Sequence, residues 1–257
     1  MFDISILQLE TMVAGFLWPL FRIASFYMAI PLIGTRLVPV RARMGLALLT
    51  TIVVYPLLPE MPDFPGLSGQ SFMIVGKQIL VGSALGFIVH VFLQIFVLGG
   101  QIIATQMGLG FASMTDPANG VSVVVLSQFY LQLVSLLFLA MNGHLVMIEV
   151  LVESFRLIPV GFEGLSQDAM LNIAKSGGWM FAGALLMALP AVTALLIINF
   201  SFGIITKAAP QLNIFAVGFP FTMLMGILIT WLSLNGFLGQ YQRFSESFLM
   251  FARQLLQ

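Results

Sequence analysis

The sequence contains no cysteine, and this absence excludes disulfide bonds, thiolate metal sites and a cysteine nucleophile. Its two histidines, His90 and His144, are too few and too far apart in the sequence to predict a metal site. Charge is also scarce, because only 8% of the residues are charged, against about 25% in a typical soluble domain. The net charge is zero, without a basic patch of the kind that binds nucleic acid. We therefore expect no metal, no cofactor and no nucleic-acid partner.

Apolar residues dominate instead: they make up 60% of the chain, and the mean hydropathy is +1.05. A soluble protein of this composition would expose apolar side chains to water and aggregate, whereas a lipid bilayer tolerates such a surface. Inside the bilayer every backbone polar group must pair internally, so spans are helices or a closed barrel. Long apolar runs without period-2 alternation exclude the barrel. The composition predicts an all-α membrane protein, with one membrane-embedded domain over residues 1–257.

Six apolar segments predict helices that form kinked hairpins, not all of which need be regular spans. They cover residues 11–33, 44–59, 72–98, 121–152, 176–204 and 214–239. A helix needs about 20 residues to cross the hydrocarbon core, so the second segment is short and the third is long. No basic residue precedes Arg22, so we expect the first segment to stay in the mature protein.

Positive charges give conflicting indications of topology. The arginine-rich loop 34–43 should lie in the cytoplasm, and so should the residues around Arg243 and Arg253. Five segments separate these two regions, which would put them on opposite sides. Either the two C-terminal bases are too few to set the orientation, or some segments pack inside an assembly instead of crossing lipid.

Three residues inside the apolar segments have a predicted packing role. Gly82 and Gly86 have the small-xxx-small spacing that allows two helices to approach closely, although glycine is also tolerated in membrane helices without such a role. Arg22 lies near the middle of the first segment, where a charge is costly unless it has a partner. We expect that partner to be an acidic residue on a neighbouring helix or subunit.

The stretch QMGLGFASMTDPANG, residues 106–120, is an apolar loop between two apolar segments. Gly108 and Gly110 give the backbone conformational freedom. Met107, Phe111 and Met114 are large, apolar and spaced by three or four residues. Asp116 and Pro117 indicate the start of a helix. Such a loop is either a deformable hydrophobic seal in the neck of a pore or a re-entrant hairpin that only packs.

Enzyme motifs are absent: the sequence has no GxSxG, no HExxH and no phosphate-binding glycine-rich loop with lysine. The triplet Asn142-Gly143-His144 could suggest a membrane-embedded base, but no nucleophile or substrate group is evident near it. A polar break in a helix is the better interpretation, and we expect no enzymatic activity.

A second polar stretch, residues 207–221, predicts a fixed turn that holds the last two helices as a hairpin for packing against a partner subunit. A plain connecting loop is the alternative. The residues concerned are Lys207, Pro210, Asn213, Phe215, Gly218 and Pro220.

Two longer stretches resemble the FliR family of the bacterial flagellar secretion system. Residues 126–161 contain an SQFY start, an FLxxNGH core and an SF…P exit, and residues 203–227 contain AP-Q-x-N-x-F followed by VGFP. The arginine-rich turn 36–48 also fits this family. The sequence departs from it at Leu145, where many members have a second histidine, and at Lys207, where arginine is common.

The resemblance implies a subunit of the flagellar type III export gate in the bacterial inner membrane, at the basal body. Such a subunit would join FliP-like and FliQ-like gate subunits, with an FlhB-like protein associated, and pass unfolded flagellar proteins. The loop 106–120 would then be a plug in the channel. Independently of the resemblance, we expect packing roles for Arg22, Gly82, Gly86, the triplet Asn142-Gly143-His144 and the stretch 207–221. A small secondary transporter is the alternative, although no inverted repeat is evident.

Overall fold

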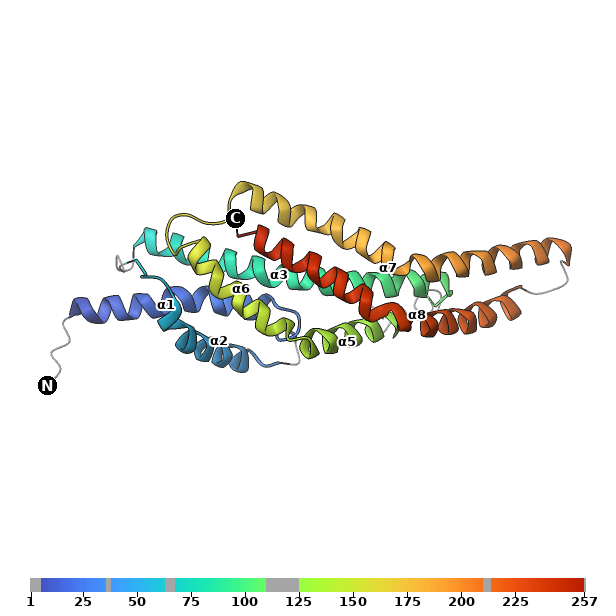
Figure 1. Ribbon diagram of the computed structural model, residues 1–257, viewed down its shortest axis with the longest axis horizontal. Coiled ribbons are helices and arrows are strands. Elements are labelled where there is room, and N and C mark those ends of the chain that lie inside the picture. Colours follow the sequence, from blue (N-terminus) through green and yellow to red (C-terminus); the bar gives the residue numbers. More distant parts are fainter. Residues whose placement is uncertain (1–5, 36–37, 63–67, 110–124, 210–213, 257) are drawn as a thin grey trace. The chain divides into compact units, whose positions relative to one another are not determined.

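The computed structural model describes residues 6–35, 38–62, 68–109, 125–209 and 214–256, without the side chains of 6–14 and 214–216. All regular secondary structure in these ranges is helical, and they contain no strand, which confirms the all-α prediction (Figure 1). The helices are α1 (Ile6–Ala29), α2 (Val40–Val54), the 3₁₀ turn η1 (Tyr55–Leu57), α3 (Gly69–Gln106), α5 (Val125–Ala140), α6 (Gly143–Leu157), α7 (Gln167–Ala208) and α8 (Ile214–Gln254).

Local sequence explains where several helices begin and end. The Ser68 hydroxyl accepts a hydrogen bond from the amide of Ser71, and the Ser166 hydroxyl accepts one from the amide of Ala169. Each serine thus satisfies a free amide in the first turn of the helix that follows it, α3 or α7. The regular turns of α2 stop at Val54 because Pro56, inside η1, has no amide hydrogen to donate.

Three helices are longer than the predicted apolar segments, and one predicted segment is two helices. α3, α7 and α8 contain 38, 42 and 41 residues and include polar turns at their ends. α8 continues through Arg243 to Gln254, beyond the predicted end at 239. The described part of segment 121–152 divides into α5 and α6, whose axes are bent by 67°.

Four helices in the described ranges are long and apolar enough to cross a membrane, and the α5–α6 pair makes a fifth span if it crosses as one. At 1.5 Å per residue, the 38 residues of α3 and the 42 of α7 correspond to roughly 57–63 Å. The hydrocarbon core is about 30 Å thick, so these helices extend well beyond it.

The chain divides into two compact units, and the boundaries fall inside α3, α5, α7 and α8. Unit 1 comprises residues 1–91, 138–176 and 248–257. Within it α2 packs against α1 (Figure 1), and the indole nitrogen of Trp18 donates a hydrogen bond to the carbonyl of Pro62 at 3.3 Å. Because this division does not test whether the units act together, one domain over 1–257 stays a prediction.

Unit 2, residues 92–137 and 177–247, has an aromatic core. Phe96 of α3 lies between Phe237 and Phe244 of α8, with ring centroids 5.5 and 5.8 Å away in edge-to-face geometry. Tyr130 of α5 reaches the same Phe237 ring at 5.6 Å. Edge-to-face aromatic pairs contribute about 0.5–1.5 kcal/mol beyond the area that they bury, so the two Phe96 contacts stabilise the packing of α3 on α8. The tilted Tyr130–Phe237 pair adds α5 to the same cluster.

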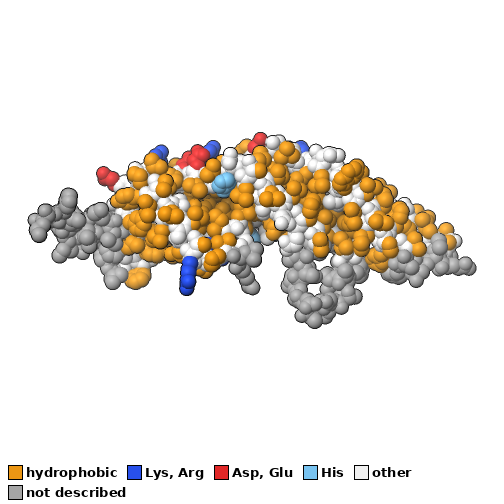
Figure 2. Space-filling view, turned by 90° about the horizontal axis from the view of Figure 1, so that it is seen from below, with side chains coloured by type: hydrophobic (Ala, Val, Ile, Leu, Met, Phe, Trp, Pro, Cys, Tyr) orange, Lys and Arg blue, Asp and Glu red, His pale blue; other side chains and the backbone are white. Residues whose placement is uncertain are grey.

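On the face in Figure 2, apolar side chains predominate over the described part of the chain, and few side chains are charged. Two-thirds (67%) of the most apolar stretch of α3 is buried, against 17% for α2 and 22% for α8. α3 is therefore the core helix, whereas α2 and α8 present apolar side chains that lipid or partner subunits must cover.

Candidate functional site

Arg22 of α1 is fully buried in unit 1, and its guanidinium is satisfied by neutral groups. Nε donates to Oε1 of Gln78 at 2.8 Å, and the two terminal nitrogens donate to the carbonyls of Ser154 and Ile158, each at 2.8 Å. The ring of Phe155 lies under the guanidinium, 4.2 Å from Cζ. Arg22 thus links α1 to α3 and to the C-terminal end of α6, which is the negative end of the helix dipole.

The expected acidic partner of Arg22 is not found among the described residues, where the bonded groups are an amide, two carbonyls and the Ser154 hydroxyl. A helix C-terminus supplies the negative end of a dipole, so it stabilises a cation without a carboxylate. The Nε2 atom of Gln78 is buried and has no hydrogen-bond partner in the described ranges, because its amide is oriented to present oxygen to Arg22.

Gly82 and Gly86 lie on the face of α3 that contacts α1. A Cβ at Gly86 would be 2.6 Å from Cβ of Ala29, and one at Gly82 would overlap the carbonyl of Arg22. Real Cβ contacts are not this short, so the two helices approach as closely as they do because these positions lack side chains. Gly76 of the same helix faces open space.

The break between α5 and α6 is the Asn142-Gly143-His144 triplet. Asn142 is left-handed, with φ 58° and ψ 23°, a conformation that asparagine adopts more easily than most residues. A Cβ on Gly143 would lie 2.6 Å from the buried ring of Phe138. His144 is half-buried, and its Nδ1 has no hydrogen-bond partner within the described chain. The triplet forms the sharp bend between α5 and α6.

The start of the predicted plug loop is held in unit 2 by α7 and α8. Gly108 has φ +82°, and a Cβ there would lie 2.7 Å from the ring of Phe219. Met107 is buried, and its side chain occupies the space that a Cβ on Gly226 would need. The Asn199 amide donates to the carbonyl of Gln106 at 3.4 Å.

The rest of this loop, with Gly110, Phe111, Met114, Asp116 and Pro117, lies outside the described residues.

Helical residues occupy both ends of the stretch 207–221. Lys207 is exposed in the last turn of α7, and α8 begins at Ile214. Phe215, the buried Gly218 and the exposed Pro220 are therefore helical, so the predicted turn does not extend over 214–221. Pro210 and Asn213 lie outside the described residues.

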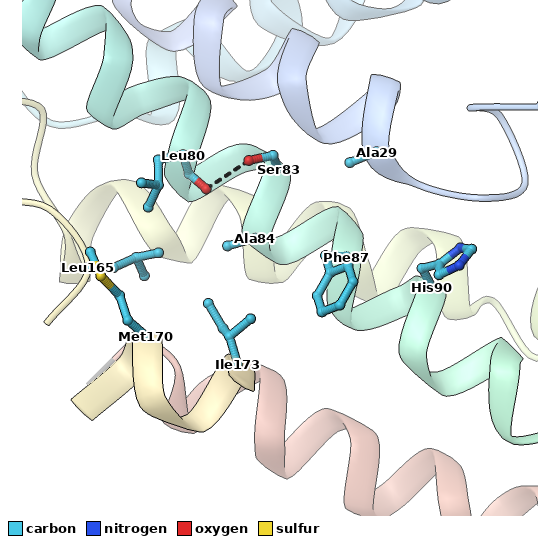
Figure 3. Close-up of a pocket in the computed structure, with 9 residues that line it drawn as sticks. All are labelled: Ala29, Leu80, Ser83, Ala84, Phe87, His90, Leu165, Met170 and Ile173. Atoms are coloured by element: carbon cyan, nitrogen blue, oxygen red, sulfur yellow. Dashed lines mark hydrogen bonds between the residues drawn. The ribbon is translucent and has the colours of Figure 1, made fainter. Parts of the chain in front are cut away.

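Unit 1 also contains an open cavity of about 570 Å³, here called the α3 groove (Figure 3). One wall is α3, and the others come from α1, α7 and the connection between α6 and α7. Its lining residues are Ala29, Leu80, Ser83, Ala84, Phe87, His90, Leu165, Met170 and Ile173. Nearly all of them are apolar, so this groove suits a hydrocarbon ligand and not a polar substrate.

Charged residues gather instead at a second cavity of unit 1, of about 580 Å³, lined by Glu149, Glu153, Arg156 and Arg253. Within the ranges that the structure describes, no three histidine, aspartate or glutamate side chains are placed to hold a metal ion.

Sequence reasoning missed the partners of Arg22 and the contacts of Met107. Gln78 precedes Gly82 by four residues, as Gly82 precedes Gly86, so all three share one face of α3. A buried glutamine on the glycine face could therefore have been recognised as a partner for the arginine. Nothing in the sequence pairs Met107 with Gly226, which is 119 residues away by residue number.

Long apolar helices, a glycine-lined helix contact and a buried arginine define an integral membrane protein of the helical class. A family model described as "Bacterial export proteins, family 1" matches residues 13–248. The chain is 40% identical over 212 residues to the flagellar biosynthetic protein FliR of Escherichia coli (82% of this chain, 81% of the relative). It is 38% identical over 216 residues to FliR of Pectobacterium carotovorum (84% and 82%) and 30% identical over 218 residues to FliR of Bacillus subtilis (84% of each).

The chain therefore belongs to the FliR family of bacterial export proteins, which confirms the resemblance. It is a membrane component of flagellar biosynthesis.

Proposed function

We propose that the chain is a subunit of the flagellar type III export gate in the bacterial inner membrane, where it forms part of the channel for unfolded flagellar proteins. Family membership over residues 13–248 is the observation that carries this proposal. The role is conduction and sealing, not catalysis, in keeping with the absence of an enzyme motif from the sequence.

The partners that we propose are FliP-like and FliQ-like gate subunits and an FlhB-like protein. The length of α8 supports the need for partner subunits. With 41 residues it is roughly 61 Å long, about twice the thickness of the hydrocarbon core. Its apolar surface is mostly exposed in the single chain, including Leu224, Ile227 and Trp231. Apolar surface that lipid does not reach needs protein cover, which neighbouring subunits would provide.

The loop 106–120 is the proposed plug. A channel wide enough for an unfolded chain would leak ions at rest, and each elementary charge that crosses 100 mV releases about 2.3 kcal/mol. A hydrophobic constriction excludes water and so prevents this leak. The contacts of Met107 and Gly108 with α8 support the proposal, because a seal needs a fixed attachment from which the rest of the loop extends.

The test is a deletion of residues 110–115 in the purified complex. The variant should still co-purify with FliP-like and FliQ-like subunits but conduct ions across a planar bilayer. Phe111→Ala with Met114→Ala should leak less than the deletion. A Gly-Ser replacement of equal length is the matched control: it keeps the loop length, removes the apolar side chains and should also leak.

An intact deletion complex with the conductance of the unmodified one would refute the plug. Purification of the chain alone or as a homo-oligomer would refute the gate assignment and favour a transporter.

A further inference from the structure

The walls of the α3 groove are almost wholly apolar. Its two polar side chains already have contacts within the chain. The Ser83 hydroxyl donates a hydrogen bond to the carbonyl of Leu80 at 3.0 Å, and the His90 ring is stacked with the Phe87 ring, with 6.5 Å between the ring centroids (Figure 3). Leu80, Phe87 and Met170 are each more than 40% exposed around the open cavity. Hydrocarbon is therefore the chemistry that fits inside this groove.

The length of the groove matches one leaflet of a bilayer. Its wall on α3 runs from Leu80 to His90, which is about 15 Å at 1.5 Å per residue. Half of a hydrocarbon core of about 30 Å is the same length. A helix of about 10 Å diameter laid along this wall would occupy about 1,200 Å³, roughly twice the cavity of about 570 Å³. A slender acyl chain fits the groove better than a partner helix does.

A lysine lies at one end of this apolar wall. Lys77 is one turn before Leu80, in the same row along α3 as Leu80, Ala84 and Phe87. Its stem packs beside Gly164, where an added Cβ would lie 3.5 Å from Lys77 Cδ, and Gly164 directly precedes Leu165 of the groove.

Lys77 is half-buried and forms no ion pair or hydrogen bond with another residue that the structure describes. A lysine stem on apolar surface with its ammonium at the membrane interface is the usual arrangement for holding an anionic headgroup.

We propose that the α3 groove binds one anionic phospholipid, with an acyl chain along Leu80, Ala84 and Phe87 and the phosphate at Lys77. This goes beyond the export role and does not depend on the plug. The apolar wall supplies affinity for any phospholipid, whereas the single cation supplies the preference for a negatively charged one.

The test compares lipids retained by the purified export complex, or by the full chain, after exchange into nanodiscs of equal phosphatidylglycerol and phosphatidylcholine. The unmodified protein should retain phosphatidylglycerol preferentially. Lys77→Gln should lower this preference about fivefold, the weight of one basic residue at an anionic surface. Ala84→Phe fills the groove and should remove the bound lipid of both kinds.

Lys175→Gln is the matched control, because Lys175 is an exposed lysine on α7 that does not line the groove. It should keep the preference of the unmodified protein. An equal preference in the Lys77→Gln and unmodified proteins would overturn the proposal. So would a photo-crosslinker at Leu80 that labels a polypeptide in the intact complex; labelling of phospholipid would support it.

Discussion

Replacing Arg22 with methionine should loosen the end of α6 selectively. Methionine fills much of the same volume but donates no hydrogen bond, so the carbonyl of Ile158 and Oε1 of Gln78 lose the partner that the structure gives them. The Ser154 carbonyl keeps its bond from the amide of Ile158. An unsatisfied buried acceptor costs about 1–3 kcal/mol, so two of them should cost about 2–6 kcal/mol.

Hydrogen exchange of the full chain in nanodiscs measures this loss of stability at individual backbone amides. Amides of residues 151–158 should exchange at least tenfold faster in Arg22→Met, because each 1.4 kcal/mol changes an opening equilibrium by about tenfold. Arg41→Met is the control, since Arg41 is exposed in the first turns of α2. It should leave exchange at 151–158 unchanged.

A second substitution tests whether Gln78 is coupled to Arg22. Gln78→Leu in the Arg22→Met background removes Oε1, which has lost its donor, and Nε2, which already has no partner among the described residues. The free energy of unfolding should therefore rise by about 1–3 kcal/mol relative to Arg22→Met alone. Unchanged exchange at 151–158 in Arg22→Met would refute the view that the arginine holds the end of α6. Equal stability of the single and double variants would refute the coupling.

Two glycine contacts give further predictions, both measured by thermal unfolding of the full chain in detergent. Gly82→Leu should lower the free energy of unfolding by about 1–3 kcal/mol through overpacking, and Gly76→Leu, facing open space, should change it by less than about 0.5 kcal/mol. Gly226→Ala should displace the Met107 side chain and lower the free energy of unfolding, and adding Met107→Ala should restore part of that free energy. Gly236→Ala is the control, because a Cβ at Gly236 meets nothing. Equal stability of Gly226→Ala and Gly236→Ala would contradict the contact between Met107 and Gly226.

The sequence predicted that the long helices exist but not their ends. Apolar runs place the starts of the third and fifth segments at 72 and 176, whereas α3 and α7 begin at Gly69 and Gln167. A helix needs backbone hydrogen bonds and not an apolar surface, so polar residues between a capping serine and the apolar run are helical too. Ser68 and Ser166 are the residues that could have located these starts.

Arg22 illustrates how far the site could be predicted. An arginine inside an apolar run must have partners, and this follows from the sequence alone. The identity of the partners does not, because Gln78, Ser154 and Ile158 are 56, 132 and 136 positions away. The positive charge of Arg22 suggests a carboxylate partner, but the carbonyls at the C-terminal end of a helix also stabilise a cation. Which helix end lies beside Arg22 depends on tertiary packing.

The distance in sequence between Arg22 and Ile158 has a consequence for biosynthesis. At 5–20 residues per second, synthesis of the 136 residues that follow Arg22, up to and including Ile158, takes on the order of 10 s. During that time α1 is complete while its guanidinium lacks the end of α6, so water or lipid headgroups must solvate it. Docking of α1 into its final place is therefore a late step of membrane insertion, and a nascent chain stalled before residue 154 would still have this charge accessible from solvent.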